Sequence, residues 1–301
     1  MKHRCEMVTA AQQEARRERR LAALVARQIM SPLAPAPDHF RVATWNVNSL
    51  RARAPALARF LERVRPDVMC LQETKASAPA PDAASLLERE GYNLAFVGEG
   101  AYNGVAIASL HPISDEQASG GFGDQHLDRE PRLITCVTGS STPVRVVSVY
   151  VPHGREVGHW HYEYKVAFLD QLARRVRDWV TDGHLIVAGD VNVAATDSDI
   201  FHPDAFVGLT HVTPRERRAW AQVLDAGLVD VDAAYWGPHE RRFTWWNHGL
   251  NYTRNLGMRI DVVAADHDLA RRVRATWIDH IERSAERPSD HAALVVDFDL
   301  E

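Results

Sequence analysis

The stretch His184-Leu-Ile-Val-Ala-Gly-Asp190-Val-Asn192-Val193 decides how the rest of the chain is interpreted. Its apolar, mostly branched residues run directly into Gly189 and Asp190, a pattern that predicts a strand buried on both faces and ending in a tight turn. Because side chains alternate along an extended chain, Asp190 and Asn192 are expected to point to the same side. The alternative is purely structural: Gly-Asp makes the turn, and Asn192 caps the next segment.

Composition describes a globular chain with 46% hydrophobic and 25% charged residues. No apolar run approaches the roughly 20 residues that a membrane span needs, so no membrane partner is expected. The cysteines, Cys5, Cys70 and Cys136, are too few and too scattered for a disulfide framework. With no secretory signal, this predicts a cytoplasmic protein. The net charge of -5 argues against coating nucleic acid by charge alone, but it leaves room for a local basic groove.

The first 39 residues differ from the remainder. An Arg- and Ala-rich segment is followed by Ser31-Pro-Leu-Ala-Pro-Ala-Pro37, which is typical of a stiff linker. We expect residues 1–39 to be a basic, flexible extension; the alternative is an arm that binds DNA or a partner. Residues 40–301 are expected to form a single catalytic domain.

Hydrophobic periodicity predicts strands and helices in a similar order in the two halves of residues 40–301. The expected strands span residues 41–47, 67–73, 92–97, 104–109, 133–138, 144–150, 184–190, 242–246, 259–265, 275–281 and 292–298. Helices are expected near residues 57–64, 162–180 and 213–227, the last starting at a capping box, Thr213-Pro-Arg-Glu216. Two sheets packed face to face with helices outside would bury these strands, which predicts an α/β (α+β) four-layer α/β/β/α sandwich.

Hydrogen-bonding or acidic residues stand at or next to many of the predicted strand ends. They are Asn46, Asn48, Glu73, Tyr150, Asp190, Asn192, Asp261, Asp290 and His291. Each alone has a structural explanation, as a turn, salt-bridge, surface or core residue. Gathered at one edge, the carboxylates among them would repel one another without a cation, and oxygen and amide ligands favour Mg²⁺ over zinc. Because Mg²⁺ often takes substrate phosphate as a ligand, a phosphate ester is the expected substrate.

Seven short motifs then point to a known family. In order, they are Trp45-Asn-Val-Asn48 with Leu50-Arg51, Leu71-Gln-Glu-Thr-Lys75, Gly104-Val-Ala, Val149-Tyr-Val-Pro152, Gly189-Asp-Val-Asn192, Gly257-Met-Arg-Ile-Asp261 and Ser289-Asp-His-Ala292. The set resembles the exonuclease III family of abasic-site endonucleases, within the endonuclease/exonuclease/phosphatase group with a DNase I-like fold. The resemblance extends from Phe40 to the C-terminus. Any one motif is weak, whereas the ordered set is specific.

The resemblance implies a monomeric Mg²⁺-dependent DNA-repair nuclease, with Mn²⁺ as a substitute metal. It would hydrolyse the phosphodiester 5' to abasic sites in double-stranded DNA. A 3'-5' exonuclease or 3'-phosphodiesterase activity at 3' ends would accompany this reaction. Two rival functions stay open: a related phosphodiesterase acting on general nucleic acid or phospholipid head groups, and a non-catalytic DNA-binding homologue.

Site roles come from the same resemblance. Asp190 would orient or deprotonate the attacking water, and His291, oriented by Asp261, would stabilise charge on the scissile phosphate. Tyr150 would assist the leaving oxygen, Asn192 would hold phosphate or water, and Asn46 would position its neighbours. The expected metal ligands are Glu73, Asn48, Asp190, Asn192, Asp290 and His291.

The resemblance also implies the substrate contacts. An apolar pocket for the baseless sugar would be lined by Trp245, Met258 and Ile260; alternatively, Trp245 and Ile260 are core residues. The candidates for contacts with backbone phosphates are Arg51, Lys75, Arg132 and Lys165. This chain has Ser49, Ala195 and Ala293 where relatives commonly have glycine, proline and proline, so shifted loops are expected. His153, His159 and His161 leave a zinc site as an alternative.

Overall fold

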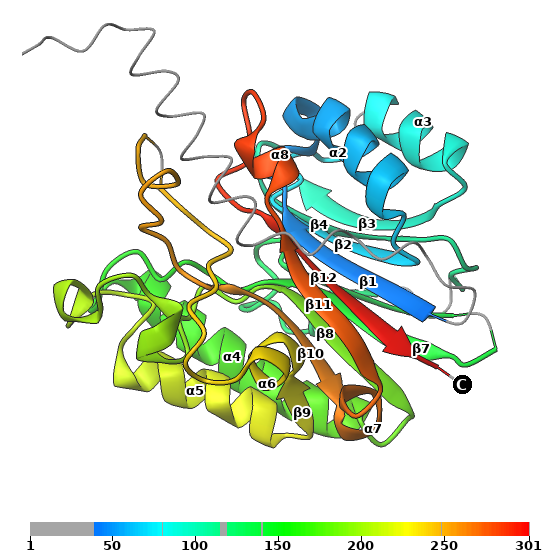
Figure 1. Ribbon diagram of the computed structural model, residues 1–301. Coiled ribbons are helices and arrows are strands. Elements are labelled where there is room, and N and C mark those ends of the chain that lie inside the picture. Colours follow the sequence, from blue (N-terminus) through cyan, green and yellow to red (C-terminus); the bar gives the residue numbers. More distant parts are fainter. Residues whose placement is uncertain (1–38, 80, 115–118, 140, 248, 301) are drawn as a thin grey trace, which may run out of the picture.

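The computed structural model describes residues 39–79, 81–114, 119–139, 141–247 and 249–300. The expected extension over residues 1–39 therefore lies almost wholly outside the described residues. Two six-stranded sheets pack face to face, and helices cover the outer side of each (Figure 1). This arrangement confirms the predicted four-layer sandwich. No helix of the described segments is both long and apolar enough to cross a membrane.

The first sheet contains the N-terminal strands and the last two strands of the chain. Its spatial order is β11 (Val273–Asp279), β12 (Ala293–Asp299), β1 (His39–Asn46), β2 (Val68–Gln72), β4 (Tyr102–Ser109) and β3 (Asn93–Glu99). Only β1 and β2 are parallel among these pairs, and α2 (Leu50–Val64) connects them. Leu57, Phe60 and Leu61 lie on the buried face of α2, as their helical spacing predicts. α3 (Pro81–Arg89) lies beside α2, and α8 (Ile281–Ser284) follows β11.

The second sheet repeats this plan. Its order is β5 (Ser119–Gly120), β6 (Leu133–Thr138), β7 (Val144–Tyr150), β8 (His184–Asp190), β10 (Asp261–Asp266) and β9 (Leu228–Asp230). β7 and β8 are its parallel pair, connected by α4 (Trp160–Trp179). The remaining helices are α5 (Pro214–Asp225), α6 (Val231–Trp236), α7 (His267–Ala270) and the 3₁₀ turns η1 (Asp197–Asp199) and η2 (Pro203–Phe206). The capping box predicted at Thr213 and Glu216 is present at the start of α5.

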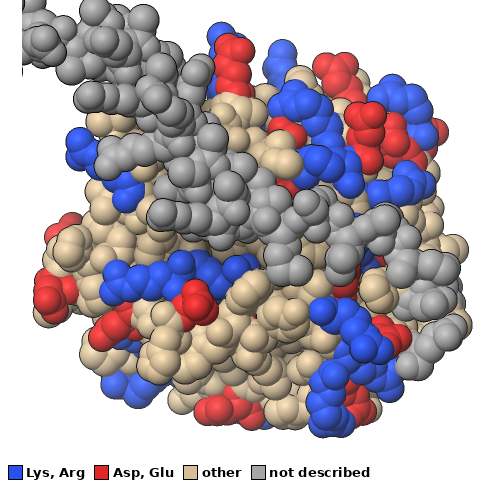
Figure 2. All heavy atoms as spheres, viewed as in Figure 1, with Lys and Arg blue, Asp and Glu red and all other residues tan. Residues whose placement is uncertain are grey.

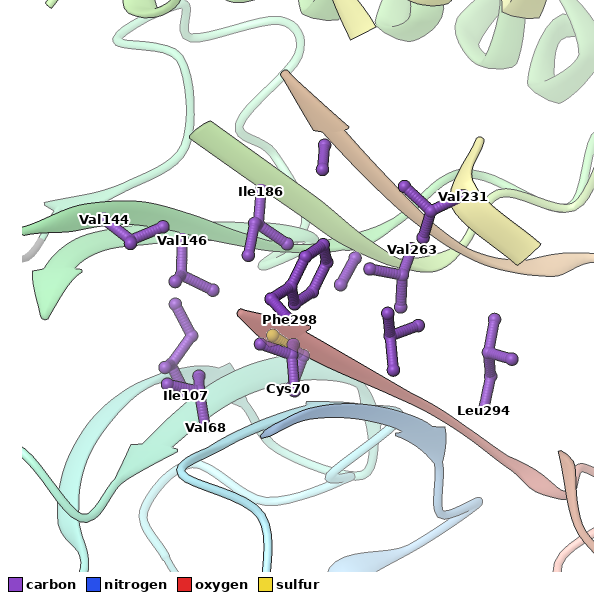
Figure 3. Close-up of a cluster of buried hydrophobic side chains, with 14 of the residues drawn as sticks. Val68, Cys70, Ile107, Val144, Val146, Ile186, Val231, Val263, Leu294 and Phe298 are labelled. Atoms are coloured by element: carbon purple, nitrogen blue, oxygen red, sulfur yellow. The ribbon is translucent and has the colours of Figure 1, made fainter. Parts of the chain in front are cut away.

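Apolar side chains from the inner faces of both sheets form the central core (Figure 3). Val68, Cys70 and Ile107 come from the first sheet, and Val146 and Ile186 from the second. This packing holds the two parallel pairs against each other. Because the strands of a parallel pair end at the same edge, the ends of β1, β2, β7 and β8 collect at one side of the molecule.

Gly189 permits a close backbone approach within the parallel pair. A Cβ atom at this position would lie 1.9 Å from the main-chain oxygen of Val149. Any side chain would therefore push β8 away from β7. The glycine that precedes Asp190 fixes where this carboxylate lies relative to Tyr150, its partner in the strand register.

One predicted strand, residues 242–246, is wrong. This segment is irregular, with isolated bridges from Trp245 to Met258 and to His291. It lacks a regular ladder because the Thr244 hydroxyl accepts the main-chain N–H groups of Ile260 and Asp261, both at 3.1 Å. The strand expected from residue 259 starts at Asp261, and the N–H of Arg259 donates instead to the main-chain oxygen of Asp199 at 2.8 Å. The sequence interpretation also missed α3, α6, α7, α8, β5, β9 and both 3₁₀ turns.

Candidate active site

Three side chains from three strand ends come together at the edge between the sheets. Glu73, Asp190 and His291 each place one ligand atom within 4.8 Å of the others. Asn46, at the end of β1, connects two of them: its Nδ2 donates to Glu73 Oε1 at 2.9 Å and to Asp190 Oδ2 at 3.0 Å. One buried amide therefore joins the carboxylates of the two sheets.

The turns after β1 and β8 share a local geometry. Asn48 and Asn192 both have left-handed backbones, with φ of 46° and 51°, a region that asparagine tolerates better than most residues. The Asn48 N–H donates to Asn46 Oδ1 at 3.1 Å, and the Asn192 N–H donates to Asp190 Oδ1 at 3.0 Å. Strand alternation therefore ends at Asp190, and Asn192 turns back to hold it through the main chain.

Asp261 and His291 form a buried pair. His291 Nδ1 lies 2.8 Å from Asp261 Oδ2, and its Nε2 lies 3.7 Å from Asp190 Oδ2. Burial disfavours the charged imidazole, but Asp261 and the neighbouring carboxylates outweigh this effect and raise the pKa of His291 to about 10. Burial raises the pKa of Asp190 to about 7, with Asp261 and Glu73 adding to the rise. The carboxylates of Asp190 and Asp261 therefore both lie beside the positively charged imidazole ring of His291.

Two hydroxyl groups position this pair. The Ser289 hydroxyl donates to the main-chain oxygen of Asn46 at 2.6 Å and accepts the His291 N–H at 3.2 Å. The Thr244 hydroxyl accepts the Asp261 N–H at 3.1 Å. The sequence interpretation missed both residues. Ser289 stood inside a quoted motif, whereas Thr244 lay within a segment interpreted as a strand, and nothing in its surroundings marked it.

A fourth carboxylate, that of Asp290, lies beside this group. Asp290 accepts from Asn48 Nδ2 at 2.9 Å and from Trp245 Nε1 at 3.1 Å. Lys75 Nζ lies 2.6 Å from Asn48 Oδ1 and 2.8 Å from Glu73 Oε2. Burial works against the charged form of Glu73, but hydrogen bonds from Lys75 and Asn46 outweigh it and lower the pKa of this carboxyl.

This donor set fits a hard divalent cation. Asp261 Oδ1 is buried and has no hydrogen-bond partner among the described residues. The oxygens gathered at this edge, from Glu73, Asp190 and the Asn48 amide, are of the types that such ions prefer. The zinc alternative finds no support, since Nδ1 of His153, of His159 and of His161 each accepts a main-chain N–H. No histidine of this trio belongs to the one metal-competent group found among the described residues.

Tyr150 completes the group from β7. Burial, reinforced by the charges of Glu73 and Asp190, raises the pKa of Tyr150 well above its usual value, so its hydroxyl stays protonated. The Arg132 guanidinium stacks 4.6 Å from the centre of the Tyr150 ring and pairs with Glu130 at 2.7 Å. Arg132 was predicted to contact a backbone phosphate. It is only 5% exposed, and its contacts make it a support for Tyr150 instead.

The remaining candidates for phosphate contacts divide by exposure. Arg51 is exposed at the start of α2, and Lys75 is partly exposed beside Glu73. Lys165 is wrong as a surface contact: it is fully buried, because it lies one turn before Leu169 on the inner face of α4. On the described surface shown in Figure 2, basic and acidic side chains are interleaved, so charge on this face is mixed.

An open pocket of about 400 Å³ borders the site. Trp245 and Met258 line it, as predicted, together with His153, Phe206 and Leu209. It adjoins the catalytic group on two sides, since Trp245 contacts Asp290 and another lining residue, His211, contacts Asn192. Ile260 does not line it. This side chain is 2% exposed and packs below the pocket against Ala194 and Ile200, so its predicted substrate contact is corrected to a core role.

Of the positions that depart from the family pattern, Ser49 has the clearest local consequence. It caps α2 with φ of 93°, a conformation that glycine adopts at lower cost. Ala293 is buried as the first residue of β12. Ala195 is partly buried against the cluster beneath α4.

Comparison with known proteins assigns the class. The model of the endonuclease/exonuclease/phosphatase family matches residues 43–291, and the chain belongs to that family. It is thus an enzyme of a metal-dependent class, and it contains an acidic group able to hold a metal.

Its relatives include an exodeoxyribonuclease from Bacillus subtilis, 29% identical over 77% of this chain and 90% of the relative. The structure of an AP endonuclease from Archaeoglobus fulgidus is similar, with 33% identity, coverage of 87% of this chain and 100% of that chain, and a TM-score of 0.80. A 3' phosphatase from Neisseria, bound to a product DNA hairpin, has 32% identity, coverage of 86% and 99%, and a TM-score of 0.80. The predicted family and fold are confirmed.

Proposed function

We propose that the protein is a DNA-repair nuclease that uses Mg²⁺, or Mn²⁺ in its place, to hydrolyse the phosphodiester on the 5' side of abasic sites. One observation carries the proposal: Glu73, Asp190 and His291 meet at a single edge with Asn46 between the two carboxylates. An exodeoxyribonuclease, an AP endonuclease and a 3' phosphatase among its relatives support DNA as the substrate.

Glu73 and Asp190 would hold the cation, with the Asn48 amide and Asp290 beside them and Asn192 next to Asp190. When bound, the cation supplies positive charge to the phosphate oxygens. Lys75 contacts both Asn48 and Glu73, and its partly exposed side chain can turn toward phosphate when the substrate arrives. Arg51, exposed in the first turn of α2, would contact the DNA backbone.

The protein's own groups then divide the reaction. Asp190, held by the Asn46 amide and the Asn192 N–H, orients or deprotonates the attacking water. His291 Nε2 faces the same space and donates to a phosphate oxygen, while Asp261 fixes the ring through Nδ1. The protonated Tyr150 hydroxyl is available to the leaving 3' oxygen.

The pocket supports two substrates rather than one. Trp245 and Met258 provide an apolar wall for a baseless sugar. The pocket's volume of about 400 Å³ and its open rim leave room for a larger group, which favours 3'-terminal trimming as a second activity.

Because this one chain supplies every residue of the catalytic group, we propose that residues 40–301 act as a single catalytic domain in a monomer. A cytoplasmic location would suit such an enzyme.

A duplex carrying one abasic analogue tests the proposal. It should be cut on the 5' side of the analogue in Mg²⁺ and remain whole in EDTA, while an undamaged duplex is cut far more slowly. Asp190→Asn should lower kcat by about 10³-fold, the range expected for losing a general base, without loss of folding. Equal cutting of both duplexes would reject abasic specificity, and hydrolysis of a phospholipid head group instead of DNA would reject the substrate class.

A further inference from the structure

A buried ion pair lies directly behind the turn that holds Asp190. Lys165 on α4 and Glu216 on α5 are both 0% exposed, and Lys165 Nζ lies 2.5 Å from Glu216 Oε1. The same ammonium group donates to the main-chain oxygen of Asn192 at 2.6 Å. A lysine buried on the inner face of α4 therefore contacts the catalytic turn from inside the protein.

Glu216 extends this contact to the neighbouring segment. Its Oε1 also accepts the Thr210 hydroxyl at 2.7 Å and the His211 N–H at 2.9 Å. Its Oε2 accepts the Thr213 N–H at 3.1 Å and lies 2.6 Å from the Thr213 hydroxyl. The residue predicted only as the acidic member of a capping box thus holds the segment before α5 as well.

The two halves of this network converge on Asn192. Lys165 fixes its main-chain oxygen, and the His211 segment, held by Glu216, brings His211 Nε2 to 3.1 Å from Asn192 Oδ1. Asn192 Nδ2 donates to the main-chain oxygen of Val151 at 2.9 Å. With its main chain and both side-chain ends held, Asn192 presents its N–H to Asp190 in one orientation.

Stability alone is a poor explanation for this pair. A buried ion pair commonly stabilises a fold no better than apolar residues of similar volume, because both charges lose their hydration. An apolar pair could join α4 to α5, but it could not donate to the Asn192 carbonyl or accept from the His211 segment. Two contacts that only the charged pair provides, from Lys165 to the Asn192 carbonyl and from the His211 N–H to Glu216, lead to the turn after β8.

We propose that Lys165 and Glu216 form a positioning pair that fixes Asn192, and through it Asp190, without touching the substrate. The inference rests on the proposed function for its effect on catalysis. Its structural half, the restraint on Asn192, stands independently of any activity.

The test replaces both partners together, since removing one would leave a buried charge. The Lys165→Met/Glu216→Gln variant keeps an amide oxygen for the capping box and removes the donor to Asn192. A matched control is Arg41→Met/Asp297→Asn, which removes another buried pair, with Nε and Oδ1 2.6 Å apart, at the far end of β1. Thermal melting establishes that both variants fold.

Two measurements decide the outcome. Hydrogen exchange of the Asn192 N–H should accelerate at least tenfold in the Lys165→Met/Glu216→Gln variant and stay unchanged in the control. In the abasic-duplex assay, kcat should fall 10- to 100-fold while KM changes less than threefold, again with no change in the control. Unchanged exchange, unchanged kcat or an effect confined to KM would overturn the proposal. If the wild-type protein cuts no DNA, the proposed function fails, and exchange alone still decides the restraint on Asn192.

Discussion

The turns after β1 and β8 are built alike and supported differently. Each places an asparagine two residues beyond a strand-end side chain and returns its N–H to that side chain. Each asparagine also meets a lysine. Lys75 is 29% exposed and contacts the Asn48 side chain, whereas Lys165 is fully buried and contacts the Asn192 main chain.

This difference separates binding from positioning. An exposed lysine on a side-chain oxygen can move when a cation or phosphate arrives, at little cost in solvation. A buried lysine cannot leave its partner without stranding a charge inside the protein. We therefore assign the turn after β1 to ligand binding and the turn after β8 to holding the group that acts on water.

Matched glycine substitutions provide the strongest test of this assignment. Because Asn48 and Asn192 both have positive φ, glycine keeps each backbone conformation and removes only the amide side chain. Asn192→Gly should lower kcat about 100-fold at saturating Mg²⁺, within the range general for misplacing a catalytic group. Asn48→Gly should instead raise the Mg²⁺ concentration needed for half-maximal activity about tenfold, as expected for a ligand neighbour.

Steady-state kinetics with a Mg²⁺ titration distinguishes the two variants. Full recovery of Asn192→Gly by excess Mg²⁺ would contradict the assignment, as would a loss of kcat in Asn48→Gly that no metal concentration restores.

The strand-end residues could be predicted because their signals are local. Apolar runs ended by Asn46, Glu73 or Asp190 show where strands stop, and parallel strands bring such ends to one edge. Lys165 carried a local signal too, since it stands at helical spacing before Leu169 and Leu172, but a lysine there was interpreted as a DNA contact. Its partner Glu216 is 51 residues away, and no local pattern connects two residues so far apart in the chain.

The prediction of a strand around Thr244 failed for the opposite reason. Its aromatic and β-branched residues favour a strand, and only tertiary contacts prevent one from forming. A threonine hydroxyl bonded to two main-chain N–H groups, those of the first residue of β10 and the residue before it, replaces the ladder there. Thr244 therefore serves the site through main-chain contacts that no local pattern in the sequence indicates.

Acid stability gives a smaller, independent test of the buried pair. Burial works against the charged form of Glu216, but the charge and hydrogen bond of Lys165 outweigh it and lower the pKa of this carboxyl. A carboxyl whose pKa is lower in the folded state contributes stability above its unfolded pKa, about 4.5, and loses it as the pH falls through the folded value. The wild-type melting temperature should therefore fall further between pH 6 and pH 3.5 than that of Lys165→Met/Glu216→Gln.

The expected difference is a few degrees, measured by calorimetry at both pH values. The Arg41→Met/Asp297→Asn variant controls for losing a buried ion pair elsewhere. Identical pH dependence in the wild-type protein and the Lys165→Met/Glu216→Gln variant would show that Glu216 carries no such contribution.

Salt dependence of DNA binding gives the smallest effect, and it separates exposed from buried cations directly. A residue that neutralises one phosphate contributes about one unit to the slope of log affinity against log salt concentration. In an Asp190→Asn background without metal, Arg51→Ala should weaken binding severalfold and lower this slope by about one unit. The Lys165→Met/Glu216→Gln pair should leave the slope unchanged, because its ammonium contacts only protein. A lower slope in that variant would place Lys165 in contact with DNA and remove the distinction between the two turns.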